Sequence, residues 1–142
     1  MNQTKKEDAI RKAKRKLGFE DSTPAKAWTI RRLDHPSETY YLVQLGDPNA
    51  PNAVAIVDPD TGEVGVYARL SGGGSHIRVD SQTAIKLVAG KENAKAELVW
   101  MPCTASESPL YPFWEVRTPS GVRYVNQQGR IHDKLDRPAP GA

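Results

Sequence analysis

Residues 53–70 constrain the fold of this chain most, because they have the pattern of a β-hairpin. Residues 53–57 are a short apolar run rich in β-branched side chains, and in residues 64–70 apolar residues alternate with glycine, tyrosine and arginine. Alternation with a period of two is typical of a strand with one buried face. Between the runs stand the residues that a tight reversal needs, Asp58-Pro59-Asp60-Thr61-Gly62-Glu63. The segment therefore predicts two adjacent antiparallel strands.

A helix and two more strands are expected before this hairpin. Thr4-Lys5-Lys6-Glu7 fits a capping box, in which the first and last side chains satisfy free backbone donors at the start of a helix. Apolar residues then recur at helical spacing up to Leu17, and Gly18 suits the left-handed residue that ends a helix. Residues 28–33 and 39–45 are rich in β-branched and aromatic side chains and predict strands.

The same order of features follows a glycine-rich connector, Ser71-Gly72-Gly73-Gly74-Ser75. Asp80 or Ser81 is suited to cap a short helix, and Gly90 is suited to end it. Further strands are predicted where β-branched and aromatic residues gather again, at residues 96–101, 113–117 and 122–126.

These elements predict an α+β fold made of two helix-plus-antiparallel-sheet halves. We expect the first half at residues 1–70 and the second at residues 80–135, joined by a linker at residues 71–79. The last residues, 136–142, contain two prolines and no apolar run, and we expect a disordered tail there.

Charge is placed unevenly along the 142 residues, whose net charge is +3. The first 17 residues carry seven lysines and arginines against two acids, so this segment is strongly basic and the remainder is slightly acidic. The basicity therefore belongs to one helix, which argues against a dedicated nucleic-acid-binding domain.

Cysteine usage and hydropathy bear on the compartment. Cys103 is the only cysteine, so no intrachain disulfide forms, and a lone thiol is typical of a reducing environment. No apolar run approaches the length of about 20 residues that a membrane-spanning helix requires. A cytoplasmic location without membrane insertion is the expectation.

The order of features resembles the PepSY domain, through the strand Tyr40-Tyr41-Leu42-Val43 and the hairpin Val54-Ala55-Ile56-Val57-Asp58 closed by Thr61-Gly62-Glu63-Val64. The second half is similar, through residues 112–116 and 122–129. The resemblance implies a tandem of two degenerate copies, and it implies a non-catalytic module that binds, and in some peptidase propeptides inhibits, a protein or peptide.

Two alternatives stay open beside this interpretation. Residues 51–63 are also similar to a family of cytoplasmic bacterial toxin-immunity domains, which implies a protein that neutralises a toxin enzyme. The basic helix, in contrast, favours an accessory nucleic-acid binder that contacts phosphates. A homodimer formed through exposed sheet edges is a further expectation about partners.

No catalytic or metal motif stands out, so neither an enzyme nor a cofactor is predicted. Cys103 has no partner motif that would activate it as a nucleophile, and the three histidines lack metal-ligand spacing. Asp58, Asp60 and Glu63 fall short of a complete calcium loop and are typical of a solvated turn.

Two sets of residues are candidates for partner contacts. Aromatic side chains dominate binding hot spots, and neighbouring aromatic residues on a strand point to opposite faces. This predicts protein contacts at Tyr40, Tyr67, Tyr111 and Phe113. The basic helix predicts contacts with a polyanion or an acidic partner at Lys12, Lys14, Arg15 and Lys16.

Overall fold

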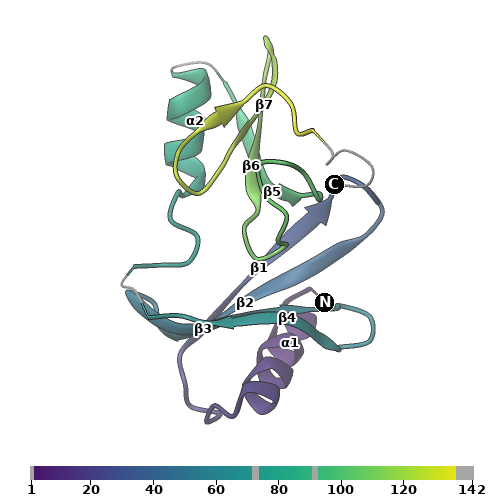
Figure 1. Ribbon diagram of the computed structural model, residues 1–142, viewed down its shortest axis with the longest axis vertical. Helices are drawn as coiled ribbons and strands as arrows, with labels where there is room; N and C mark the ends of the chain where they lie inside the picture. The colour runs from purple at the N-terminus through teal and green to yellow at the C-terminus, as the bar shows by residue number, and fades with distance from the viewer. Residues whose placement is uncertain (1, 72–73, 91–92, 137–142) are drawn as a thin grey trace. The chain divides into compact units, whose positions relative to one another are not determined.

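The computed structural model describes residues 2–71, 74–90 and 93–136 (Figure 1). The chain divides into two compact units: the first holds the residues up to Ile30 together with Glu38–His76, and the second holds Arg31–Ser37 together with the residues from Ile77 onward. The predicted linker, residues 71–79, therefore spans the division, although its residues 72–73 lie outside the described residues.

The described residues at the end of that segment bond buried glutamine side chains, one in each unit. In the first unit the backbone N–H of His76 donates to the Gln44 side-chain oxygen, at 2.7 Å. In the second unit the backbone N–H of Val79 donates to the Gln127 side-chain oxygen, at 3.1 Å. Both glutamines are at most 5% exposed. His76 and Val79 consequently have defined hydrogen-bond partners. The glycine-rich sequence just before them predicted a flexible linker instead.

The first unit consists of helix α1 (Asn2–Leu17), most of strand β1 (Ala25–Arg32), and strands β2 (Thr39–Asp47), β3 (Ala50–Val57) and β4 (Val64–Arg69). The last two residues of β1, Arg31 and Arg32, belong to the second unit. The strand order of the first unit is β4-β3-β2-β1, and both the β2–β3 and the β3–β4 pairs are antiparallel. Helix α1 lies against one face of β2, β3 and β4 (Figure 1).

Small side chains let α1 approach this sheet closely. Ala9, Ala13 and Leu17 form one buried stripe of the helix. They pack on alternate residues of β2 and β3, namely Tyr41, Val43, Leu45, Ala53, Ala55 and Val57. Gly18 follows the helix with a φ of +78°, which confirms the predicted helix end. The predicted start is wrong, because the helix already includes Asn2 and Thr4 therefore does not occupy the N-cap position.

The β3–β4 hairpin is confirmed, and a side chain holds its turn. The Asp58 carboxylate accepts the backbone N–H groups of Asp60 and Thr61, at 2.8 and 2.9 Å. These bonds hold the pKa of Asp58 below its ordinary value, chiefly through the Thr61 N–H. Gly62 then takes a φ of +72°, a left-handed conformation that favours glycine.

Strand β4 differs from the regular alternation that its sequence predicts. Val57 pairs with Val64 and Ala55 with Tyr67, so two steps on β3 match three on β4, and β4 contains a bulge. Val66 and Tyr67 are consequently both 50% exposed although they are neighbours. Strand β4 is also the last strand of the order, so only one of its edges is paired with a described strand.

The second unit consists of α2 (Ser81–Ala89), β5 (Lys95–Trp100), β6 (Phe113–Thr118), β7 (Gly121–Val125) and the short β8 (Ile131–His132), which the sequence analysis missed. Strands β5 to β8 pair antiparallel in chain order. The last two residues of β1 pair with the end of β5 in parallel. The expectation that all strands pair antiparallel is therefore wrong for this one pair.

Helix α2 begins and ends where its sequence predicts. The Asp80 carboxylate caps its start by accepting the Thr83 N–H at 2.8 Å, and Gly90 ends it with a φ of +59°. Ala84 is fully buried and packs with Val116 and Val125 of the strands that the helix covers (Figure 1).

The described residues confirm an α+β fold with mostly antiparallel strands. Whether the two units are copies of one ancestral unit stays a prediction. No helix in the described part of the chain has both the length and the apolar character needed to cross a membrane. The tail predicted at residues 136–142 lies outside the described residues except for Asp136, whose carbonyl accepts the Thr104 N–H.

We expect Asp58→Ala to lower the thermal midpoint of unfolding by about 3 °C at pH 7, because two turn N–H groups lose their acceptor. The folded-state pKa of Asp58 is depressed, so its contribution is present above the unfolded pKa and is lost as pH falls through the folded value. The difference from the parent should shrink below about pH 4. Asp60→Ala is the matched control, and a gap that stays constant down to about pH 2 would contradict this account.

Candidate protein-contact site

Two of the four aromatic residues predicted to contact a partner are buried. Tyr40 is 5% exposed and Phe113 is fully buried. Its neighbour Tyr41 is also only 4% exposed, although neighbouring side chains on a strand point to opposite faces. Strand β2 is buried continuously from Tyr40 to Gly46, which means that both of its faces are covered. A strand covered on both faces offers no side chain to a partner.

The other two predicted residues are well exposed. Tyr67 on β4 is 50% exposed, and Tyr111 in the loop between β5 and β6 is 47% exposed. Tyrosine side chains are enriched at protein interfaces, because the ring buries a large apolar area and the hydroxyl keeps a polar partner. Of the two, Tyr111 also lines a pocket.

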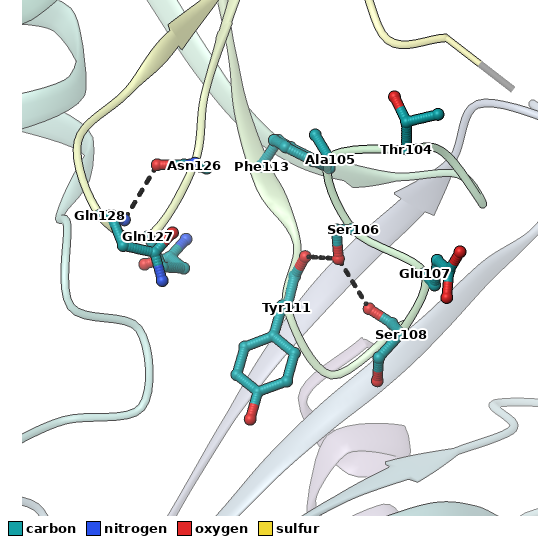
Figure 2. Close-up of a pocket in the computed structure, with 10 residues that line it drawn as sticks. All are labelled: Thr104, Ala105, Ser106, Glu107, Ser108, Tyr111, Phe113, Asn126, Gln127 and Gln128. Carbon is teal, nitrogen blue, oxygen red and sulfur yellow. Dashed lines mark hydrogen bonds between the residues drawn. The ribbon is translucent and has the colours of Figure 1, made fainter. Parts of the chain in front are cut away.

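This pocket lies within the second unit and has a volume of about 590 Å³ (Figure 2). One wall is the loop from Thr104 to Tyr111, and the other is the turn from Asn126 to Gln128 between β7 and β8. Phe113, at the start of β6, contributes to the lining between them. The structure thus brings Tyr111 and Phe113 together, the first as an exposed ring and the second as part of the base.

Hydrogen bonds to Ser106 and Ser108 hold the loop that carries Tyr111. The Ser106 hydroxyl lies 2.9 Å from the Tyr111 carbonyl and 3.1 Å from the Ser108 carbonyl, so its single proton is shared between two acceptors (Figure 2). The Tyr111 N–H donates to the Ser108 carbonyl at 3.1 Å, and the Leu110 N–H donates to the Ser108 hydroxyl at 3.2 Å. The Tyr111 backbone is therefore fixed on both of its polar groups.

The opposite wall is held by two amide side chains. The buried Gln127 side chain accepts the Val79 N–H and donates to the Pro112 carbonyl, each at 3.1 Å. The Asn126 side-chain oxygen accepts the N–H group of Gln128 at 2.9 Å (Figure 2). It also accepts the N–H group of Arg130, at 2.9 Å. Because Pro112 adjoins Tyr111, the Gln127 amide links the two walls of the pocket.

The lining is suited to recognition by shape and hydrogen bonding. Among its ten described residues only Glu107 is charged, and that carboxylate is exposed. Three hydroxyl groups of serine or threonine line the pocket, and two of them, those of Ser106 and Ser108, bond backbone groups within their own loop. No lysine, arginine or histidine side chain lines this described pocket to activate one of these hydroxyls.

A charged cluster that the sequence analysis missed lies on the strands of the second unit. The Glu115 side chain is only 3% exposed and accepts from Arg31 at 3.1 Å and from Arg117 at 2.7 Å. Arg31 also forms a two-pronged bond to Glu97, at 3.0 and 3.1 Å, which raises its pKa. Burial and the Glu115 charge raise the pKa of the nearby Tyr124. A glutamate within an apolar strand was the only sequence signal for this cluster.

These charges neutralise one another rather than forming a free anion or cation site. A buried carboxylate needs such partners, since removing either one leaves an uncompensated charge. We therefore assign the cluster a structural role in joining β1, β5 and β6.

Of the four basic residues of α1 predicted to contact a partner, one is buried and three are exposed. Lys14 is 8% exposed and its ammonium donates to the Asp21 carbonyl at 2.7 Å, so its place among the contact residues is a wrong prediction. The reason is its helical spacing, because Lys14 lies one turn from both Ile10 and Leu17, which pack at the core of this unit. Lys12, Arg15 and Lys16 are exposed.

Two of the remaining candidate groups, Cys103 and His132, make contacts within the second unit. Cys103 is fully buried, and its thiol lies 3.5 Å from the Ser106 carbonyl at the base of the pocket loop. His132 makes an edge-to-face contact with Phe113. No group of three or more metal-binding side chains occurs among the described residues.

Comparison of the chain with protein-family models, with curated proteins and with solved structures returned no match.

We expect Gln127→Ala to lower the free energy of unfolding by about 1–3 kcal/mol, because the Val79 N–H and the Pro112 carbonyl lose a buried partner. Urea denaturation followed by tryptophan fluorescence measures this change. Gln128→Ala is the matched control, since this neighbour is exposed, and we expect a change within about 0.5 kcal/mol. Equal effects of the two substitutions would contradict the role given to Gln127.

Proposed function

We propose that this chain is a cytoplasmic, non-catalytic module of PepSY-like build that binds a protein or peptide and acts by occupying the surface of its partner. The observation that carries the proposal is Tyr111, a large aromatic side chain 47% exposed on a loop whose backbone is held by hydrogen bonds. A fixed exposed ring contacts a partner without a further loss of loop entropy, and rings of this kind contribute most to binding.

The pocket beside Tyr111 supports recognition of a short segment rather than a flat surface. Its volume of about 590 Å³ accommodates a few side chains of a partner. The exposed Glu107 carboxylate and the Gln128 amide at its borders supply polar contacts that set orientation. A Lys or Arg side chain of the partner fits this combination, because a carboxylate and an aromatic ring both attract a cation.

The absence of an activated nucleophile from the described lining favours binding over turnover. An inhibitor of a peptidase or another enzyme needs only to cover its target, which this site permits. An immunity protein that neutralises a toxin enzyme is the alternative role, and it would use the same surface, with Glu107 facing a basic toxin.

A nucleic-acid-binding role through α1 is the weaker alternative. Because the Lys14 ammonium bonds the Asp21 carbonyl, only three of the four predicted cations remain exposed. No exposed aromatic residue interleaves with them along the helix sequence, so bases would have no stacking partner there.

Selection of peptides from a random display library tests the proposal. The full chain serves as bait, and the affinities of the enriched peptides for the parent and for the Tyr111→Ala variant are measured by fluorescence anisotropy. We expect Tyr111→Ala to weaken binding by about thirtyfold, as for a hot-spot aromatic residue. Glu107→Gln should weaken binding of peptides that contain lysine or arginine.

Val122→Ala is the matched control, because Val122 is 41% exposed in the same unit and does not line the pocket. It should change affinity by less than about threefold. Mass spectrometry after prolonged incubation should recover the peptides unchanged. Peptides that bind the parent and Tyr111→Ala equally well would overturn the assignment of the site, and chemically altered peptides would overturn the non-catalytic role.

A further inference from the structure

We propose that the free edge of β4, together with the basic flank of α1, binds an extended acidic segment that adds to the sheet of the first unit as an antiparallel strand. This surface lies in the first unit and does not include Tyr111, so it does not rest on the function proposed above. It concerns Tyr67, Arg69, Lys12 and Lys16, all of which are exposed.

Backbone pairing shows which groups of β4 face the free edge. The Leu70 N–H donates to the Asn52 carbonyl at 2.8 Å, and Ala68 pairs with Val54. Because inward and outward backbone groups alternate along an antiparallel strand, Leu70 and Ala68 point toward β3. Tyr67 and Arg69 therefore direct their N–H and C=O groups to the edge at which no described strand pairs.

The side chains of the same two residues lie on the face that α1 covers. Tyr67 pairs with Ala55 and Arg69 with Ala53, and both of these alanines pack against α1. Directly paired residues of antiparallel strands point to the same face. The Arg69 guanidinium also donates to the Leu17 carbonyl at the end of α1, at 2.9 Å, and lies 5.3 Å from the Phe19 ring centre.

The flank of α1 beside β4 is basic. The Lys12 ammonium lies against Gly62 in the hairpin turn, close enough that a side chain at Gly62 would collide with it. Lys16 is one helical turn further along and on the same flank. With Arg69, this flank presents three cations along the face of β4 that carries the exposed Tyr67 ring.

These two features together define the occupant. A strand that pairs with Tyr67 and Arg69 places every second side chain over the α1 flank, where a carboxylate meets Lys12, Lys16 or Arg69. The segment that fits is extended and carries Asp or Glu at alternate positions. Glu63 precedes β4 at the end of the strand away from Arg69, where its carboxylate would repel an acidic side chain. The acidic residues of the segment therefore belong opposite residues 67–69.

The same charges disfavour a second copy of this chain at the edge. Antiparallel pairing of two β4 strands would relate them by a two-fold axis and place both α1 helices on the same face. The Lys12, Lys16 and Arg69 charges of the two copies would then repel one another. A polyanion without backbone amides would satisfy the cations and leave the strand edge unused.

Synthetic ten-residue peptides with alternating glutamate and valine test the proposal against the full chain. Methylation of the glutamate amide nitrogens should weaken binding by at least about tenfold, because in antiparallel pairing these N–H groups face β4. Methylation of the valine amide nitrogens should have an effect below about threefold, since those groups face away. In hydrogen exchange, the Tyr67 and Arg69 amides should become protected when the parent peptide binds.

Substitutions that change the net charge equally provide the matched control. The double substitution Lys12→Gln with Lys16→Gln should weaken peptide binding by about tenfold. Arg11→Gln with Arg15→Gln removes two charges from the opposite, solvent-facing side of α1 and should change affinity by less than about threefold. Both proteins keep the buried stripe of the helix.

Several outcomes would overturn the proposal. Equal affinities of the two methylated peptides would exclude strand addition. A single-stranded oligonucleotide that binds as tightly as the peptide, with the same sensitivity to Lys12→Gln and Lys16→Gln, would identify a polyanion as the ligand. A dimer of the free chain with Tyr67 and Arg69 amides already protected would identify a second copy. Loss of peptide binding in Tyr111→Ala would move the binding event to the other site.

Discussion

The buried amide of Gln127 is the interaction on which the second unit most depends. Its two bonds join the segment before α2, through Val79, to the loop that carries Tyr111, through Pro112. Neither backbone group has a place in a strand ladder, and a buried amide pairs with both because it is donor and acceptor at once. Gln44 has the corresponding part in the first unit, where it accepts the His76 N–H. Side-chain amides thus replace strand pairing where the chain is irregular.

The two proposed contact surfaces differ in how they are held. Around Tyr111 the walls are fixed by side-chain hydrogen bonds and enclose a pocket, so side-chain shape would decide what binds. Along β4 the surface is a backbone edge beside a row of cations, so an alternating charge pattern would decide. The first arrangement favours a few well-fitted side chains, and the second favours a sequence pattern that many segments can satisfy.

Local signals predicted the elements well, and burial poorly. The hairpin turn at Asp58 and the caps of α2 depend on contacts between residues a few positions apart. A short stretch of sequence is therefore enough to predict them. Exposure depends on what covers a strand, which no local pattern contains, and this is why Tyr40 and Phe113 were misplaced. The same limit hid the partners of Glu115, because Arg31 is distant in sequence. Short β8 has too few residues to show any period.

The bulge in β4 limits how far any assembly can grow along the edge of the sheet. The bulge interrupts the pairing with β3 between Val64 and Tyr67. Only the stretch from Tyr67 to Arg69 therefore pairs in regular register. Fibrous stacking requires long, flat strands that recruit identical neighbours without end. A short regular stretch that ends at an arginine would allow a few backbone bonds to one added strand and would form no continuous template. The same irregularity that leaves Tyr67 accessible therefore protects this chain from polymerising through its open strand.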